Sequence, residues 1–454
     1  MNDVTYTREQ VQEIAKSLLG KTFGELNNYQ TKAELYNKGS HGHILEEDVY
    51  HYGINSKSEP DFAEAGVELK VTPYKINKNG KLSAKERLVL NIINYMEEYK
   101  FTFYTSHFWA KNKLTQIVWY LHEDNVPKDK FKITHELLFS FPEDDLQIIK
   151  NDWETIIAKI KAGKAHELSE ADTMYLGACT KGANANSVRK QPFSDILAKQ
   201  RAFCLKTSYM TQLVRWYIGG ENIEKVCPHL NPNLTFEQEL KAKLSIYVGK
   251  TVEELCEKFN LTINAKNLNE RLLAKMLGIK GRIAQTDEFQ KANIVPKTIR
   301  VNEKGTIKES MSFPTFKFDE IVNQNWEDSD LYVMFSTTKF MFVIFVEKNG
   351  HYEFQGIKFW NMPMSILEND VKNTWCKTVD VIKNGEIIKE IKNNKRYTNF
   401  PGMSENEYCH VRPHGQNAND TYPLPVRDKM TGITEYTKQC FWLNNSYILK
   451  IISE

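Results

Sequence analysis

The chain has 454 residues, of which 41% are hydrophobic and 26% charged, which is ordinary for a globular protein with room for two or more domains. A net charge of +2 excludes a globally basic, histone-like protein, but a local basic groove for nucleic acid needs no such excess. The apolar runs are too short to span a membrane, the N-terminal residues lack a secretory signal, and the seven cysteines are dispersed without a Cys-x-x-Cys pair. We therefore expect a cytoplasmic, multidomain protein without a membrane partner.

The spacing of apolar residues predicts an α/β fold in each half of the chain. Apolar residues at helical spacing alternate along the sequence with short apolar or strictly alternating runs that suit strands. In chain order, the pattern predicts a helix at 4–19, strands at 66–72, 88–93 and 116–121, a helix from 143 to 160, a helix at 236–248, and strands at 332–335 and 340–346.

Three segments of the first half recur in the second half, in the same order and at nearly constant spacing. One such match could arise by chance, but three in register indicate a duplicated domain. The pairs are 20–26 (GKTFGEL) with 249–255 (GKTVEEL), 182–186 (GANAN) with 415–419 (GQNAN), and 204–209 (CLKTSY) with 442–447 (WLNNSY).

A turn-rich stretch separates the two copies. Gly219 and Gly220 end the first pattern, and Pro228 and Pro232 follow in a segment that also contains several asparagines. We therefore predict a first domain at 1–225, a linker at 226–239 and a second domain at 240–454. The alternative is a long surface loop within one domain, but the spacing of the repeat favours a linker.

Residues 59–71 place two acids and an amine close together. In the predicted strand, side chains alternate between faces, so Val67, Leu69 and Val71 point to the core while Glu68 and Lys70 share the other face. Asp61 precedes a glycine turn and can fold back beside Glu68. Carboxylate oxygens bind Mg²⁺, which activates water for phosphodiester hydrolysis, and the amine can stabilise developing charge. The alternative is an edge strand with a solvated polar face, because this spacing alone is a weak signal.

The arrangement Pro-Asp…Glu-x-Lys resembles the signature of the PD-(D/E)xK nucleases, and residues 61–70 are similar to the matching segment of the MutH family of mismatch-repair nicking enzymes. The resemblance continues in unbroken order over about residues 10–215. With a degenerate second copy added, the chain resembles the two-domain Sau-type type II restriction endonucleases, which cut GATC. This resemblance implies two tandem restriction-endonuclease-like domains, each a mixed β-sheet flanked by helices.

The resemblance also implies the residues that act. Asp61, Glu68 and Glu46 would hold one or two Mg²⁺ ions, and Lys70 would complete the catalytic set. Lys113 is a further active-site or phosphate contact, although its neighbour Lys111 is an equally good candidate. His107 is expected to form hydrogen bonds rather than to act as a base. The residues expected to contact DNA in this half are Lys38, Gly39, Lys181 and Asn184.

The second copy is expected to bind DNA without cutting it. Thr298 and Arg300 stand at the positions of the strand's Glu and Lys, unless the two copies are misaligned. Threonine cannot replace a charged metal ligand, and arginine cannot act as a base. The copy keeps a loop, Arg412-Pro413-His414, that resembles the base-reading loop of the family, and Arg412 can donate two hydrogen bonds to guanine. The alternative role of Arg412 is a phosphate clamp.

These observations predict a Mg²⁺-dependent type II restriction endonuclease that acts on double-stranded DNA. Its second domain would bind a second GATC site as an effector, so that two sites take part in each functional complex. One active centre per chain further implies a DNA-induced dimer or two successive nicks. The alternatives are a MutH-type repair nickase, which would need only one domain, and a DNA-binding regulator that does not cleave.

Overall fold

The computed structural model describes residues 5–27, 39–52, 59–182, 186–263, 265, 267–392 and 395–454. The chain forms two compact units, of which the first contains Met1–Glu239 and Ala284–Ile294 and the second contains Leu240–Ile283 and Val295–Glu454. The segment Ala284–Ile294 thus returns to the first unit before the chain enters the main part of the second. No helix among the described residues is long and apolar enough to cross a membrane.

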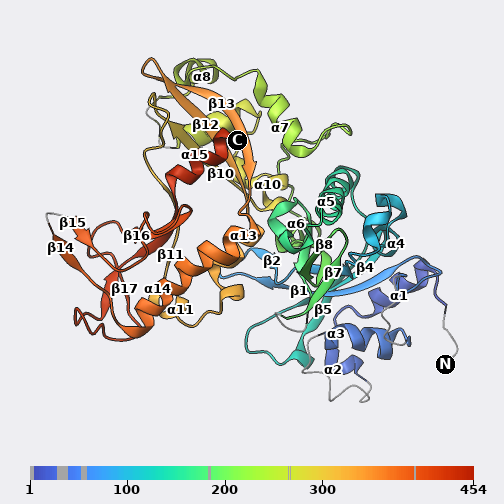
Figure 1. Ribbon diagram of the computed structural model, residues 1–454. Coiled ribbons are helices and arrows are strands. Elements are labelled where there is room, and N and C mark those ends of the chain that lie inside the picture. The colour runs from blue at the N-terminus through green and yellow to red at the C-terminus, as the bar shows by residue number, and fades with distance from the viewer. Residues whose placement is uncertain are drawn as a thin grey trace. The chain divides into compact units, whose positions relative to one another are not determined.

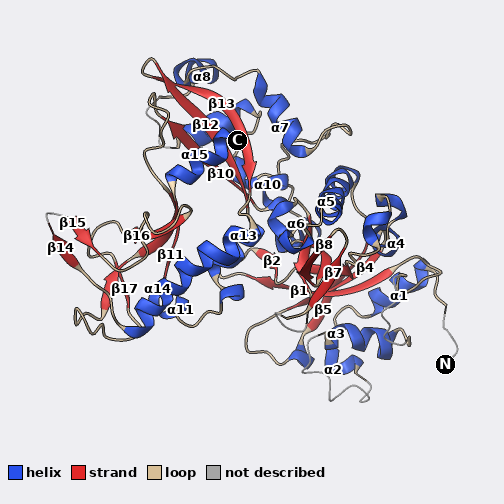
Figure 2. Ribbon diagram, in the orientation of Figure 1, coloured by secondary structure: helices blue, strands red, loops and turns tan. Residues whose placement is uncertain are grey.

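The first unit combines a four-stranded sheet with helices on its flanks (Figure 1). Helix α1 packs against β4 and β5, and α6 packs against β2 (Figure 2). Its main elements are α1 (Arg8–Ser17), α2 (Phe23–Leu26), α3 (Ser40–His43), β1 (Glu68–Ile76), β2 (Leu82–Ala84), β3 (Leu88–Ile92), α4 (His107–Asn112), β4 (Thr115–Leu121), β5 (Lys132–Phe139), α5 (Glu143–Lys161), β6 (Leu176–Thr180), β7 (Val188–Gln191), β8 (Ser194–Lys199), β9 (Arg201–Leu205), α6 (Thr207–Tyr217) and α10 (Asp287–Ala292).

Strand β1 lies inside the main sheet, whose order is β2-β1-β4-β5. It pairs antiparallel with β2 and parallel with β4, while β4 pairs antiparallel with β5, so the sheet is mixed. A second sheet has the order β3-β9-β6. Residues Glu68–Tyr74 of β1 pair with β4, whereas β2 pairs only with Tyr74–Ile76, so among the described strands the first part of β1 has a neighbour on one side. Its apolar residues join a core whose buried members include Val11, Ala15, Leu18, Val67, Leu69, Val118, Tyr120 and Ile133.

The second unit repeats the sheet orders of the first. Strands β10-β12-β13 correspond in order to β1-β4-β5, and β11-β19-β16 correspond to β3-β9-β6. The elements assigned mainly to it are α7 (Phe236–Ser245), α8 (Val252–Phe259), α9 (Leu268–Met276), β10 (Ile294–Val301), β11 (Met311–Phe316), α11 (Phe318–Ile321), α12 (Asp330–Thr337), β12 (Lys339–Lys348), β13 (His351–Trp360), α13 (Met364–Ile366), α14 (Lys372–Asn384), β14 (Glu390–Lys392), β15 (Lys395–Tyr397), β16 (Cys409–Pro413), β17 (Thr421–Pro423), β18 (Glu435–Thr437), β19 (Gln439–Leu443) and α15 (Asn445–Ser453).

Individual hydrogen bonds recur at equivalent places in the two units. The N–H of Gly20 donates to the carbonyl of Ile133 at 2.9 Å, and the N–H of Gly249 donates to the carbonyl of Phe354 at 2.8 Å. Each glycine is followed by a threonine that begins a short helix with a capping box. Each copy also begins a later helix with a serine N-cap. These capping residues are Thr22, Thr251, Ser106 and Ser329.

The predicted strand at 332–335 is wrong, because these residues belong to helix α12. Ser329 caps this helix by accepting a hydrogen bond from the N–H of Tyr332 at 3.2 Å. Leu331 and Phe335, which are one helical turn apart, are the side chains that α12 buries. A short apolar run fits a strand and a buried helical turn equally well, so the sequence pattern alone could not separate them.

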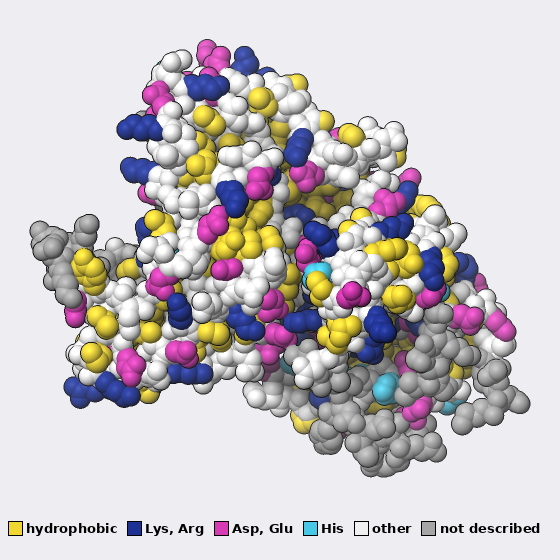
Figure 3. All heavy atoms as spheres, viewed as in Figure 1, with side chains coloured by type: hydrophobic (Ala, Val, Ile, Leu, Met, Phe, Trp, Pro, Cys, Tyr) yellow, Lys and Arg dark blue, Asp and Glu magenta, His cyan; other side chains and the backbone are white. Residues whose placement is uncertain are grey.

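The visible surface carries both signs of charge. On the face shown in Figure 3, Lys and Arg side chains are interspersed with Asp and Glu side chains, consistent with the net charge of +2.

Candidate active site

A short hairpin brings Asp61 to the beginning of β1. An isolated antiparallel bridge closes this hairpin, and Gly66 turns the chain with a φ of +65°, a left-handed conformation that favours glycine. The N–H of Asp61 donates to Glu68 Oε2 at 3.1 Å, and Asp61 Oδ2 accepts from the N–H of Leu69 at 3.0 Å. Two hydrogen bonds therefore hold the two acidic residues beside each other.

Glu68 and Lys70 project from the same face of β1. Lys70 Nζ donates to Glu68 Oε1 at 2.7 Å. The intervening Leu69 is buried in the core, and Val71 packs against that core. Glu68 itself is only 1% exposed, so its carboxylate lies inside the protein rather than on a solvated strand face. The structure thus brings together Asp61, Glu68 and Lys70, the three residues that the sequence motif contains.

Helix α4 brings a second amine to the same carboxylate. Lys111 Nζ lies 3.5 Å from Glu68 Oε2, with only 11% of the Lys111 side chain exposed. Lys113 is exposed at the C-cap of α4, and within the described residues no contact joins it to Asp61 or Glu68. Of the two lysines that the sequence left open, Lys111 is therefore the one that reaches the acidic pair.

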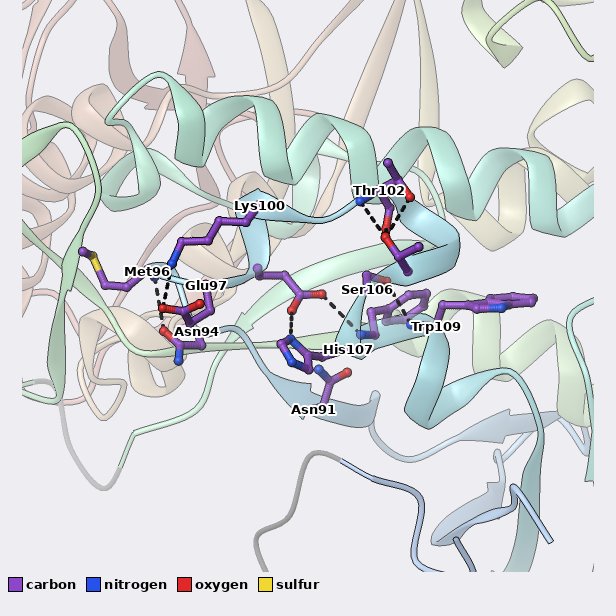
Figure 4. A network of polar contacts seen from close by, with 12 residues as sticks. Asn91, Asn94, Met96, Glu97, Lys100, Thr102, Ser106, His107 and Trp109 are labelled. Atoms are coloured by element: carbon purple, nitrogen blue, oxygen red, sulfur yellow. Dashed lines mark hydrogen bonds and ion pairs between the residues drawn. The ribbon is translucent and has the colours of Figure 1, made fainter. Parts of the chain in front are cut away.

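A buried acid anchors the beginning of α4. Glu98 Oε2 lies 2.9 Å from His107 Nδ1, and Glu98 Oε1 accepts from the N–H of Phe108 at 3.2 Å. Ser106 caps the helix by accepting from the N–H of Trp109 at 3.1 Å. Figure 4 shows Ser106, His107 and Trp109 within this network. His107 therefore helps to fix the helix that carries Lys111.

Glu46 is electrostatically linked to the same cluster. It lies on a π-helical segment, Ile44–Val49, of a kind that often occurs at functional sites. Burial raises the pKa of Glu46, and the charge of Asp61 raises it further, while His43 and Lys70 act in the opposite direction. Glu46, the third predicted metal ligand, is thus close enough to Asp61, Glu68 and Lys70 to feel their charges.

Tyr52 is a member of this site that sequence reasoning missed. Burial raises the pKa of the Tyr52 phenol, and the charges of Asp61, Glu46 and Glu68 raise it further. The phenol therefore remains protonated beside the three carboxylates. The motif gives no signal for this residue, because it reaches the site through the fold rather than through a fixed spacing from Asp61.

The cluster is a buried excess of carboxylate charge. Burial raises the pKa of Glu68, with Asp61 adding to the effect, although Lys70 and Lys111 partly offset it. A cation that binds here would lower the free energy of the ionised carboxylates by Coulombic attraction. The three acids of the cluster, Asp61, Glu68 and Glu46, outnumber its two cations, Lys70 and Lys111, by one.

The donor set fits Mg²⁺. Among the residues described, no three His, Cys, Asp or Glu side chains come close enough to enclose a metal ion by themselves. Mg²⁺ does not need such a cage, because it is usually held by one or two carboxylates together with waters and phosphate oxygens. Asp61 and Glu68, held side by side by hydrogen bonds, would provide the two hard oxygen ligands, and Glu46 feels the charges of both.

The predicted DNA contacts of the first unit are only partly described. Lys38 and Asn184 lie outside the described residues. Gly39 precedes α3 with a φ of +95°. Lys181 is exposed just after β6, and its N–H donates to the carbonyl of Gln200 at 2.9 Å. Gly39 and Lys181 are therefore at element ends that a partner could reach.

Strand β10 in the second unit repeats the alternation of β1 with different chemistry. Ile299 and Val301 are buried in the core of the second unit, while Thr298 and Arg300 are exposed on the other face. The residues that sequence comparison aligns with Glu68 and Lys70 thus share a face, but they offer no carboxylate.

The predicted reading loop of the second unit begins at β16. Arg412, Pro413 and His414 are all exposed. The guanidinium carbon of Arg412 lies 4.1 Å from the ring centroid of Trp442, and the Trp442 indole N–H donates to the Arg412 carbonyl at 3.4 Å. The N–H of His414 donates to the carbonyl of Lys438 at 2.9 Å, which matches the bond made by Lys181 in the first unit.

Comparisons with known proteins identify the family of the chain. The family profile described as the DNA mismatch repair enzyme MutH matches residues 50–152, which include Asp61, Glu68, Lys70 and Lys111. The MutH mismatch repair protein of Vibrio campbellii is 29% identical to the chain, over 47% of the chain and 96% of its own length. That of Escherichia coli O127:H6 is also 29% identical, over 46% of the chain and 92% of its own length. The type II restriction enzyme Sau3AI of Staphylococcus aureus is 40% identical over 99% of both chains. The chain therefore belongs to the MutH-like type II restriction endonucleases.

Proposed function

We propose that this restriction endonuclease cuts double-stranded DNA in a Mg²⁺-dependent reaction at a short palindromic site, 5′-GATC-3′. The observation that carries the proposal is the joined Asp61–Glu68 pair with Lys70 at 2.7 Å from Glu68. The resemblance to the GATC-cutting Sau-type enzymes supports the recognition sequence. The chain's membership of the type II restriction endonucleases supports cleavage of both strands over nicking for repair.

The residues of the first unit have separate tasks in this reaction. Asp61 and Glu68, with Glu46 nearby, would hold Mg²⁺, which when bound polarises the phosphate and lowers the pKa of an attacking water. Lys70 lies next to Glu68, where its ammonium can orient that water or stabilise the charge that develops on the phosphate oxygens. Lys111 neutralises the other oxygen of Glu68 and keeps the carboxylate in place.

Cleavage of a plasmid with one GATC site tests this function. We expect linear product in Mg²⁺ and none in EDTA, with all ends mapping to the site. Glu68→Ala should slow cleavage at least about 1,000-fold, because it removes a metal ligand worth several kcal/mol. Glu64→Ala is the matched control, since Glu64 is exposed on the same hairpin. Nicked circles as the only product would favour a repair nickase, and intact plasmid would favour a non-cleaving DNA-binding protein.

The second unit is proposed to bind a second recognition site and to act as an effector. The exposed Arg412 loop and the lack of carboxylates at Thr298 and Arg300 support a unit that binds DNA without cutting it. Two sites on one DNA raise the effective concentration of the second site. A plasmid with two sites should therefore be cut faster than a plasmid with one. Equal rates on the two plasmids would contradict the effector role.

One active centre per chain must act on two strands. We propose that two chains meet on the DNA, each cutting one strand. Sedimentation of the Glu68→Ala chain with a one-site duplex should then give a complex of two chains per duplex. A complex of one chain per duplex would instead point to two successive nicks.

A further inference from the structure

The second unit contains a cavity at the place that corresponds to the cleavage centre of the first. The cavity has a volume of about 730 Å³, and four consecutive residues of β10, 297–300, line it. Two of these, Thr298 and Arg300, are aligned with Glu68 and Lys70 of β1. The second copy has therefore lost the acidic motif but keeps a hollow of ligand size at the same strand.

The cavity contains an amine without a counter-charge. Lys297 is partly buried, and among the described residues no carboxylate forms an ion pair with it. Burial alone lowers the pKa of its ammonium, with no acidic group acting to raise it. A partly buried cation of this kind is stabilised when an anion joins it, because the anion restores the charge interactions that burial removes.

Two further cations and several hydroxyls face the same cavity. The guanidinium carbon of Arg300 lies 5.2 Å from the centroid of the Tyr352 ring in a cation–π contact. A contact with a ring face uses none of the guanidinium N–H donors, which can bind an oxyanion. Lys308 lines the cavity together with Ser310 and Ser312. The lining also includes two acids, Glu309 and Glu347, so the positive charges exceed the negative ones by a small margin.

We propose that this cavity binds a phosphate group of the DNA backbone, with Lys297 and Arg300 as its principal contacts. The inference rests on the proposed function, because the phosphate belongs to the DNA that the second unit holds as effector. The second unit would then hold DNA by charge at the site on β10 that corresponds to the proposed metal site on β1. Such a contact fixes the register of the protein on DNA and carries no sequence information.

Chemical labelling of lysines tests the proposal directly. The full-length Glu68→Gln chain, which should not cut DNA, is treated with an amine-acylating reagent near neutral pH, and labelling is read by mass spectrometry. Lys297 should be labelled in the free chain and protected by a GATC duplex, but not by inorganic phosphate at the same phosphate concentration. Lys377 is the control, because it is exposed in the same unit and pairs with Glu405 outside the cavity. It should be labelled throughout.

The salt dependence of DNA binding gives an independent readout. Replacing both Lys297→Gln and Arg300→Gln should reduce the slope of log affinity against log salt by about 1 for each lost phosphate contact. Lys377→Gln should leave the slope unchanged. Protection of Lys297 by inorganic phosphate but not by DNA, or an unchanged slope in the double variant, would overturn the proposal. Cleavage of plasmid by the unmodified chain tests the proposed function separately, so the two failures are distinguishable.

Discussion

Lys111 Nζ lies 3.5 Å from Oε2 of Glu68, while the other oxygen of that carboxylate receives Lys70 at 2.7 Å. Each oxygen of Glu68 thus faces its own ammonium, and one of the two comes from a helix outside the sequence motif. Glu68 is almost fully buried, and these two contacts hold its carboxylate together with the hydrogen bond from the N–H of Asp61 to Oε2. The contact with Lys111 therefore connects α4 with the proposed cleavage centre.

This contact predicts different effects for two neighbouring lysines. Lys111→Ala should lower the cleavage rate by about 10- to 100-fold, because it removes a group that orients a metal ligand. Lys113→Ala should have a much smaller effect, since Lys113 is exposed at the end of α4. Single-turnover cleavage of a one-site duplex measures both, with thermal melting to verify that each variant is folded. A larger loss for Lys113→Ala than for Lys111→Ala would show that Lys113, the residue implied by the family resemblance, is the active-site lysine.

The turn that delivers Asp61 predicts a backbone effect at Gly66. Its φ of +65° costs a residue with a Cβ about 1–2 kcal/mol, although the nearest atom to an added Cβ, Arg8 Nη2, would be 3.9 Å away. Gly66→Ala should therefore lower both the free energy of unfolding and the cleavage rate. Gly66→Asn should restore most of each, because asparagine tolerates this conformation better. Equal losses for alanine and asparagine would indicate that steric crowding, rather than φ, limits this position.

The sequence predicted the hairpin and strand of the site because their signals are local. A proline, a glycine turn and a strict alternation place Asp61, Glu68 and Lys70 close together within ten residues of the sequence itself. Lys111 and Tyr52 could not be assigned in this way, because each reaches Glu68 or Asp61 only through packing of the whole unit. The run at 332–335 shows the same limit, since its helix depends on the cap at Ser329 and on burial of one face.

The raised pKa of Glu46 predicts how stability depends on pH. The carboxyl has an ordinary pKa of 4.5, and burial raises it in the folded chain, so ionisation of Glu46 opposes folding. The contribution of neutral Glu46 to the free energy of unfolding is fully present below the pKa of the unfolded chain. It is lost as pH rises through the pKa of the folded chain. Without metal, Glu46→Gln should therefore melt at a higher temperature than the unmodified chain at neutral pH. The difference should shrink toward zero as pH falls to about 4.

Melting in EDTA over a pH series from about 4 to about 8 measures this difference. Glu47→Gln makes the same chemical change one position along the same helical segment and is the control. An advantage of Glu46→Gln that is independent of pH would mean that the side chain acts through packing rather than through charge.

The same raised pKa values predict how metal binding depends on pH. Burial raises the pKa of Glu68 as well as that of Glu46, and a carboxyl must lose its proton before it can ligate a cation. Mg²⁺ affinity should therefore fall as pH falls, and bound Mg²⁺ should release protons. Titration calorimetry of the metal-free chain in buffers with different ionisation enthalpies detects that release. Equal heats in all buffers at mildly acidic pH would contradict it.

Arg412 is held over the Trp442 ring at 4.1 Å, and this placement separates its two candidate roles. If its guanidinium reads guanine, Arg412→Lys keeps the charge but loses the two-pronged contact, which is worth about 1–3 kcal/mol of discrimination. If it clamps a phosphate, lysine should substitute well, because a point charge is enough. We expect Arg412 to read guanine. Arg412→Lys and Arg412→Ala should then both lose the faster cutting of two-site plasmid over one-site plasmid. Arg427→Lys, an exposed arginine of the same unit, should keep the two-site advantage. An Arg412→Lys chain that also keeps it would assign Arg412 to the DNA backbone.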